Sequence, residues 1–287
     1  MDWARDGKDW PHRERSRFES AGGVRWHVQQ WPAPHAGAPQ WLLLHGTGAS
    51  AHSWRGLAPL LAARVGVVAI DLPGHAFSSA GAASMHEMAS SVHALLAAMV
   101  VAPEVIVGHS AGAAIGVRMA LQEPGALRAL VGLNAAMLPL GGVAGRLFSP
   151  AAKLLALNPL VPHFFSWHAA DRVVLKRLLD STGSKLDDTG TALYRRLIGS
   201  PAHVAGALAM MARWDLPALA ADLPQLSTPL HLLAAELDGT IPPADARRVQ
   251  TLVPGSTLTP LPALGHLAHE ENPAGVAELL LQRLALL

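Results

Sequence analysis

A serine stands between two glycines in the pentapeptide Gly108-His109-Ser110-Ala111-Gly112. The apolar run Val105–His109 precedes this serine, and a helix-forming stretch follows it. On a tight strand-to-helix turn the hydroxyl projects above the sheet, and glycines on either side relieve the crowding. The start of the following helix offers backbone N–H groups where an oxyanion would form. The pentapeptide alone also fits an ordinary Gly-rich turn, but its flanking strand and helix favour a nucleophilic Ser110.

A serine hydroxyl becomes a useful nucleophile when a base removes its proton and a third group orients that base. Asp238 follows the apolar run Leu230–Ala234, and His266 follows the run Leu258–Leu261. Parallel strands end at one edge of a sheet, so both side chains are expected on loops at the edge that carries Ser110. We therefore predict a catalytic triad of Ser110, Asp238 and His266.

Two members of this triad have competing interpretations. Asp238 before Gly239 also fits a turn residue, and His266 also fits a surface-loop histidine. Glu236 and His269 are neighbouring candidates for the acid and the base. The ordered set of serine, aspartate and histidine favours the triad over these separate interpretations.

An oxyanion hole needs two N–H donors near the nucleophile. One is the backbone N–H of Ala111, the residue that follows the serine. The other is expected from the loop His45-Gly46-Thr47-Gly48, which follows the apolar run Trp41–His45. We select the Thr47 N–H because the glycines on either side let the backbone bend toward the site.

Short apolar runs and longer helical patterns alternate along the chain, which is typical of a parallel sheet with crossover helices. Several runs are apolar throughout, as expected for strands that helices cover on both faces. The sequence therefore predicts an α/β fold with a mostly parallel central sheet. The predicted strands are Trp26–Trp31, Trp41–His45, Val67–Asp71, Val105–His109, Leu130–Asn134, Leu230–Ala234 and Leu258–Leu261, and the predicted helices include Met85–Val100, Gly112–Leu121 and Ala274–Leu287.

Residues 136–226 interrupt this alternation with helical stretches and no good strand, and aromatic and methionine side chains gather there. We interpret this span as a helical cap inserted into an α/β core made of residues 1–135 and 227–287. Phe165, Trp167 and Trp214 are the predicted substrate-binding residues of the cap. Core packing is the alternative interpretation of the two tryptophans.

Composition excludes several classes of function. The 287-residue chain has a net charge of +1, which gives no field to attract nucleic acid. It contains no cysteine, so disulfides, thiolate metal sites and cysteine nucleophiles are excluded. His163 and His168 favour packing over metal ligation, and no Gly-x-Gly-x-x-Gly or Walker-type motif follows a strand. We expect no metal and no cofactor.

The N-terminal stretch is charged and has no apolar signal-peptide core, so a cytoplasmic location is expected. The uncharged run most suggestive of a membrane span lies between Arg128 and Arg146 and contains Asn134, Pro139 and Gly141-Gly142. These residues interrupt an apolar helix, so we expect no transmembrane segment. Peripheral contact with a membrane surface stays open.

Taken in order, these motifs resemble the α/β-hydrolase superfamily, from about Gly22 to the C-terminus. The resemblance implies the α/β-hydrolase fold and the chain order serine, acid, histidine. In some members the acid follows the strand before the cap; Asn134 stands there in this chain, which favours Asp238. Ala76 stands where the family usually has glycine. The matching motifs are His45-Gly46-Thr47-Gly48, Asp71-Leu72-Pro73-Gly74-His75, Gly108–Gly112, Asp238-x-x-Ile241-Pro242 and Gly265-His266 with Glu271 and Pro273.

A narrower resemblance is to the magnesium-chelatase accessory hydrolases of bacteriochlorophyll biosynthesis. It implies a role in a photosynthetic organism at the step that inserts Mg²⁺ into protoporphyrin. Magnesium-chelatase subunits would then be protein partners, and a tetrapyrrole would be a small-molecule partner. The residues that carry this resemblance are Asp9-Trp10-Pro11, Ser16-Arg17-Phe18, Ala21–Gln29, Leu43–Ser50 and His52-Ser53-Trp54-Arg55.

Three functions are consistent with these motifs. The first is a serine hydrolase that cleaves an ester or related acyl bond of a hydrophobic substrate, as an accessory factor at the magnesium-chelatase step. The second is a non-enzymatic carrier that binds a tetrapyrrole in the same pocket. The third is a generic carboxylesterase or carbon–carbon bond hydrolase outside pigment synthesis. The set of Ser110, Asp238 and His266 favours the first, because a carrier needs no triad.

Overall fold

The computed structural model describes residues 1–139, 158, 160–169 and 171–284. An eight-stranded sheet runs through the molecule with the strand order β1-β2-β4-β3-β5-β6-β7-β8. β2 is antiparallel to both of its neighbours, and all other neighbouring strands are parallel. The strands are β1 (Ser16–Ala21), β2 (Val24–Trp31), β3 (Gln40–Leu44), β4 (Gly66–Ile70), β5 (Val105–His109), β6 (Ala129–Leu133), β7 (Leu230–Ala235) and β8 (Thr257–Leu261).

The predicted α/β fold is confirmed, and the seven predicted strands are present as β2 to β8. β1 was not predicted, because its sequence SRFESA is polar and only partly buried at the sheet edge. Gly22 and Gly23 both have positive φ, and they form the two-residue turn that pairs Ala21 with Val24. This glycine pair is the signal of a β-hairpin that could have revealed the strand.

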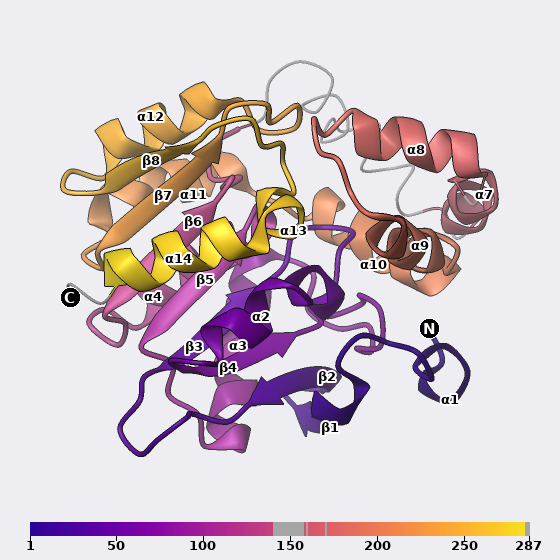
Figure 1. Ribbon diagram of the computed structural model, residues 1–287, viewed down its shortest axis with the longest axis horizontal. Coiled ribbons are helices and arrows are strands. Elements are labelled where there is room, and N and C mark those ends of the chain that lie inside the picture. The colour runs from indigo at the N-terminus through magenta and orange to yellow at the C-terminus, as the bar shows by residue number, and fades with distance from the viewer. Residues whose placement is uncertain (140–157, 159, 170, 285–287) are drawn as a thin grey trace.

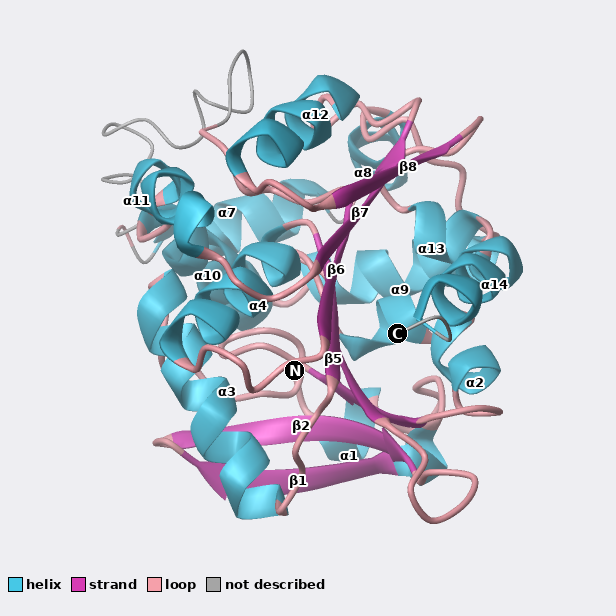
Figure 2. Ribbon diagram, turned by 90° about the vertical axis from the view of Figure 1, so that its left-hand side faces the viewer, coloured by secondary structure: helices cyan, strands magenta, loops and turns pink. Residues whose placement is uncertain are grey.

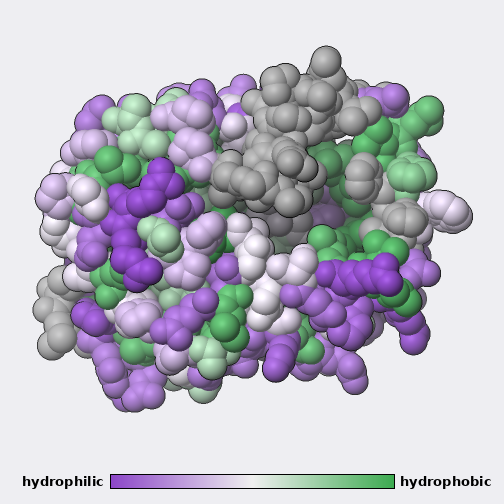
Figure 3. Space-filling view, turned by 90° about the horizontal axis from the view of Figure 1, so that it is seen from above, coloured by the Kyte–Doolittle hydropathy of each residue, from purple (hydrophilic) through white to green (hydrophobic). Residues whose placement is uncertain are grey.

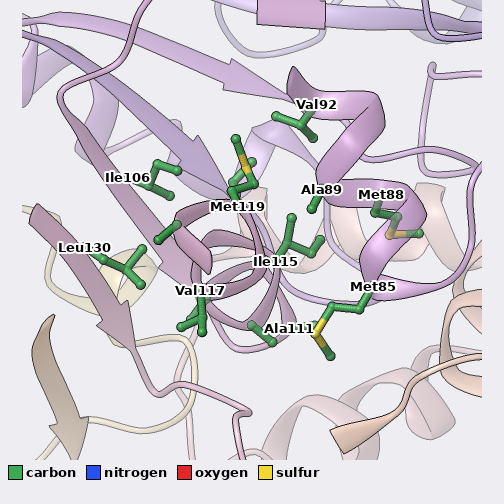
Figure 4. Close-up of a cluster of buried hydrophobic side chains, with 14 of the residues drawn as sticks. Met85, Met88, Ala89, Val92, Ile106, Ala111, Ile115, Val117, Met119 and Leu130 are labelled. Carbon is green, nitrogen blue, oxygen red and sulfur yellow. The ribbon is translucent and has the colours of Figure 1, made fainter. Parts of the chain in front are cut away.

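Helices cover both faces of the sheet, as the edge-on view in Figure 2 shows. Successive residues of β3 point to opposite faces. Leu42 and Leu44 join the core beneath α3 (Met85–Met99) and α4 (Ala111–Gln122), drawn in Figure 4. Trp41 and Leu43 join the second core beneath the helices α2 (Leu57–Leu61) and α14 (Pro273–Leu284). Alternate side chains of each apolar strand therefore pack into the cores on opposite faces of the sheet.

Helix signals agree with the observed ends. Ser84 and Glu87 form a capping box at the start of α3, with each side chain bound to the other residue's backbone N–H. The predicted helices appear as α3, α4 and α14, although residues 285–287 of the last prediction lie outside the described residues. The remaining helices of the sheet region are α1 (Trp3–Asp6), α12 (Pro243–Leu252) and α13 (Ala268–Glu271).

Among its described residues, the chain between β6 and β7 forms five further α-helices, a short 3-10 helix (Leu223–Gln225) and no strand. Figure 1 shows α7 to α10 grouped beside one end of the sheet. Trp214, Leu216 and Leu219, by contrast, pack into the core that contains α3 and α4. The division into core and cap stays a prediction. The five helices are α7 (Leu160–Ala169), α8 (Arg172–Asp180), α9 (Asp188–Ile198), α10 (Pro201–Ala212) and α11 (Leu216–Asp222).

No helix within the described ranges is both long enough and apolar enough to span a membrane. The uncharged run noted between Arg128 and Arg146 begins with the buried strand β6. Its part from residue 140 onward lies outside the described residues.

α10 packs against the sheet region through a direct backbone contact. A Cβ atom on Gly206 would overlap the carbonyl oxygen of Gly74, because the two glycine backbones touch. We predict that Gly206→Ala lowers the free energy of unfolding by about 1–3 kcal/mol, the usual cost of overpacking. Chemical denaturation measures this change. The exposed Ala202→Ser variant on the same helix is the control, and equal stability of both variants would contradict the contact.

Candidate active site

Ser110 lies on the turn between β5 and α4 with φ of 51° and ψ of −117°. A residue with a side chain rarely adopts such a positive φ, and this strained conformation is typical of functional turns. The turn also needs glycine on either side. A Cβ on Gly108 would overlap the backbone of Ala113, and one on Gly112 would overlap the carbonyl of Leu44. The pentapeptide therefore forms a tight, strained strand-to-helix turn rather than an open Gly-rich turn, which is the backbone geometry that the predicted nucleophile requires.

His266 and Asp238 are hydrogen-bonded through Nδ1 and Oδ2 at 2.8 Å, and both side chains are buried. The other carboxylate oxygen of Asp238 accepts the N–H groups of Thr240 and Ile241 at 2.7 and 2.8 Å. One carboxylate oxygen of Asp238 therefore closes the turn, as the alternative interpretation expects, while the other bonds His266, as a triad would require. Glu236, the alternative acid, is exposed.

His269, the alternative base, lies in a different environment. Its ring is fully buried against the rings of Trp54 and His109, each at a centroid distance of 4.6 Å. Burial lowers the pKa of His269 to about 3, and the nearby His266 and Arg55 add to that shift. Neither of its ring nitrogens has a hydrogen-bond partner among the described residues. His269 is therefore a neutral packing residue.

The ring of His266 lies 4.6 Å from the ring of His109, the residue before Ser110. Its backbone carbonyl accepts hydrogen bonds from His109 Nε2 at 2.9 Å and from Asn134 Nδ2 at 2.8 Å. The structure thus brings His266 beside the elbow. In the described part of the chain, the Ser110 hydroxyl itself makes no hydrogen bond.

Asn134 ties three loops together and was missed as a site residue by sequence reasoning. Its amide donates to the carbonyls of Gly265 and His266, and its Oδ1 accepts the N–H of Ala235 at 2.7 Å. It also holds a positive φ of 44°. An asparagine directly after a buried strand was the available signal, because asparagine tolerates this backbone conformation better than most residues.

The loop His45–Gly48 lies beside Ser110. His45 is buried, with Nδ1 donating to the Gly46 carbonyl at 2.8 Å and Nε2 accepting the N–H of Leu72 at 2.9 Å. A Cβ on Gly46 would lie 3.0 Å from Ser110 Cβ, so only glycine fits this approach. The N–H groups of Thr47 and Ala111 donate to no acceptor within the described residues. Their role as an oxyanion hole stays a prediction.

Side chains of α10 contact the loop His45–Gly48. His203 accepts the N–H of Ala76 at Nδ1, at 3.0 Å, so its Nε2 carries the proton and donates to the Gly48 carbonyl at 3.1 Å. Burial lowers the pKa of His203 to about 4 and keeps the ring neutral. The Thr47 hydroxyl contacts Met210 Sδ at 3.4 Å. His203 and Met210 were not predicted, because their partners are distant in sequence.

The three predicted substrate-binding residues differ in their surroundings. Trp214 is buried in the core, in agreement with its alternative interpretation. Trp167 is 77% exposed on α7. Phe165 belongs to α7, but its side chain lies outside the described residues. Their role in substrate binding stays a prediction. The described side chains include no group of three or more His, Asp or Glu placed to hold a metal.

The chain matches the model of the alpha/beta hydrolase fold over residues 42–273 and belongs to this family. The narrower resemblance is also confirmed: a relative from Rhodobacter capsulatus, the magnesium-chelatase 30 kDa subunit, is 37% identical over 276 residues, 95% of each chain.

Solved structures show the same fold at lower identity. An epoxide hydrolase aligns with a TM-score of 0.78 and 21% identity over 94% of this chain and 98% of its own. The enol-lactonase from Burkholderia xenovorans LB400 aligns with a TM-score of 0.77 and 18% identity over 94% of this chain and 100% of its own. These likenesses establish the fold alone.

The buried histidine on α10 predicts a pH effect on stability. An unfolded histidine titrates near pH 6.5, whereas folded His203 titrates at about 4. Between these values the unfolded chain binds a proton that the folded chain does not, so stability falls as pH falls. The slope is roughly 1.4 kcal/mol per pH unit at most. We predict that His203→Gln reduces the loss of stability between pH 6.5 and 4.5, measured by chemical denaturation.

The control for this comparison is His35→Gln, at an exposed position. Burial also raises the pKa of Glu270 to about 7, so its ionisation lowers stability as pH rises from about 4.5 to 7. Wild type, His203→Gln and His35→Gln all keep Glu270, so its contribution cancels when their changes in stability with pH are compared. Identical pH slopes for wild type and His203→Gln would contradict a neutral buried His203.

Proposed function

We propose that this protein is a serine hydrolase that cleaves an ester or related acyl bond of a hydrophobic substrate. The observation that supports it most strongly is the convergence at one sheet edge of three features. These are the elbow that carries Ser110, the hydrogen-bonded pair of His266 and Asp238, and the unpaired N–H groups of Thr47 and Ala111. A binding protein would need none of them in this arrangement.

The proposed reaction follows from the positions of these groups. Ser110 Oγ attacks the acyl carbon while His266 Nε2 takes its proton, and Asp238 holds the opposite ring N–H in place. The N–H groups of Thr47 and Ala111 stabilise the oxyanion of the tetrahedral intermediate. His266 then returns the proton to the leaving group, and a water molecule hydrolyses the acyl-enzyme by the same steps.

The hydrophobic nature of the substrate is inferred from the surface around α7 and α8. Figure 3 shows hydrophobic side chains gathered at this end of the molecule. Exposed apolar side chains that gather into a contiguous patch mark binding surfaces. The exposed residues concerned are Leu160, Phe164, Trp167, Val173 and Leu178.

The pathway assignment is supported by the magnesium-chelatase 30 kDa subunit, which matches this chain over nearly its full length. We place the hydrolase as an accessory factor at the step that inserts Mg²⁺ into protoporphyrin. The name of that relative describes a chelatase subunit rather than a hydrolase. It therefore also favours the second candidate function, a tetrapyrrole carrier for the chelatase that uses the same pocket without cleavage.

Removing the nucleophile or the base should abolish hydrolysis. We predict that Ser110→Ala and His266→Ala each lower kcat for short p-nitrophenyl esters by about 10³-fold or more, because triad members act as a unit. Ser110→Ala should also lose covalent labelling by a fluorophosphonate probe. The exposed Ser90→Ala variant should keep both properties. Undiminished esterase activity in the two site variants would refute the triad.

Complementation of a deletion strain separates the enzyme from the carrier. Loss of the gene should lower Mg-protoporphyrin and raise protoporphyrin, measured by pigment extraction and fluorescence. Ser110→Ala keeps the pocket and lacks the nucleophile, so we predict that it fails to restore pigment at equal protein level. Full restoration by Ser110→Ala would establish the carrier instead. Normal pigment in the deletion strain would remove the pathway assignment and leave the hydrolase.

A further inference from the structure

A single carbonyl oxygen in the loop between α8 and α9 joins the loop of the acid to the loop of the base. Thr182 O accepts the N–H of Gly239, next to Asp238, at 3.1 Å, and the N–H of His266 at 3.0 Å. The two loops leave different strands, β7 and β8, and belong to the sheet region. Thr182 belongs to the helical segment between β6 and β7, which reaches into the site at this point.

The same loop lies against both neighbours without room for side chains. Gly183 has a φ of +76°, and a Cβ there would overlap the carbonyl oxygen of Leu237. A Cβ on Gly265 would in turn overlap the backbone of Gly183. Glycine is required at both positions because three backbones meet there. The close contact between the α8–α9 loop and the loops of Asp238 and His266 therefore depends on glycine at these two positions.

Each of the three successive N–H groups around His266 has its own acceptor. Ser184 Oγ accepts the N–H of Leu267 at 2.8 Å, and the Ser184 side chain is buried. The carboxylate of Glu271 accepts the N–H of Gly265 at 2.8 Å and that of Lys185 at 3.0 Å. The α8–α9 loop therefore supplies two of the three acceptors, the Thr182 carbonyl for His266 and the Ser184 hydroxyl for Leu267. It is also bonded to the third acceptor, Glu271, through the N–H of Lys185.

The loop is itself anchored to the sheet region on its far side. Arg55 bonds the carboxylate of Asp187, at the start of α9, at 2.7 Å and that of Glu270 at 2.5 Å. The Tyr194 hydroxyl of α9 donates to the same Glu270 at 2.8 Å. The Glu270 side chain is fully buried and the Arg55 head group is mostly buried, whereas the Asp187 carboxylate is 64% exposed. The loop is therefore tied to the sheet region through Glu270, by the hydrogen bond from Tyr194 and by Arg55, which bridges Glu270 to Asp187.

We infer that Thr182–Ser184 is a positioning segment for the His266–Asp238 pair, and that Ser184 is a positioning residue for hydrolysis. This inference rests on the proposed function. A base that transfers a proton in the transition state must be held within a fraction of an ångström, and a misplacement of about 1 Å costs about 100-fold in rate. The segment supplies that constraint through acceptors on consecutive backbone N–H groups.

Ser184→Ala tests the inference, because it removes only the acceptor of the Leu267 N–H. We expect kcat for p-nitrophenyl acetate to fall about 10- to 100-fold, while KM stays within about twofold. The low-field proton resonance of the His266–Asp238 hydrogen bond should shift or broaden. Ser184→Thr keeps the hydroxyl and should restore both properties. Ser181→Ala, an exposed serine of the same loop whose hydroxyl bonds the Leu178 carbonyl, should leave both unchanged.

Wild-type kcat and an unmoved resonance in Ser184→Ala would overturn the inference. Equal losses in Ser184→Ala and Ser181→Ala would overturn it too, because they would indicate general softening of the loop. The resonance does not depend on turnover. If wild type neither hydrolyses esters nor reacts with a fluorophosphonate, the proposed hydrolase fails. A shifted resonance in Ser184→Ala would then still support the positioning of the pair.

Discussion

The whole site depends on the strained backbone of Ser110 and on the close packing that surrounds it. A positive φ at a residue with a side chain persists only where neighbouring structure leaves no alternative. Here β3 supplies that constraint: its carbonyl at Leu44 occupies the space where a Cβ of Gly112 would stand. The loop that continues β3 approaches Ser110 closely at Gly46. Ser110 and the predicted oxyanion donor Thr47 are therefore positioned by one pair of neighbouring strands, β3 and β5.

Much of this arrangement could be predicted because it depends on local sequence. Strands covered on both faces are apolar throughout, so β3 to β7 stand out from the helices between them. The elbow stands out because Gly108 and Gly112 lie at fixed offsets from Ser110. Asp238 and His266 could be selected because parallel strands end at one edge.

The parts that were not predicted depend on contacts between residues far apart in the chain. Asn134 was considered only as the absence of an acid, yet it tethers the loop of His266. Thr182 and Ser184 lie in a polar loop with no periodic pattern, and Thr182 acts through a carbonyl that every residue type carries. A pattern of residue types along the sequence therefore cannot predict such a hydrogen bond. β1 was overlooked because its edge position leaves its composition polar.

The meeting of Gly183 and Gly265 also limits how the segment between β6 and β7 could be replaced by another sequence. Both ends of that segment lie in the sheet region, which makes it a natural unit for grafting. In this chain a graft would bring a foreign loop to the place of Thr182 and Gly183. It would remove the shared acceptor of Gly239 and His266 unless the donor insertion presented a carbonyl and a glycine at the same point. A graft that keeps the acceptor of Gly239 and His266 is therefore limited to the helices on either side of this loop.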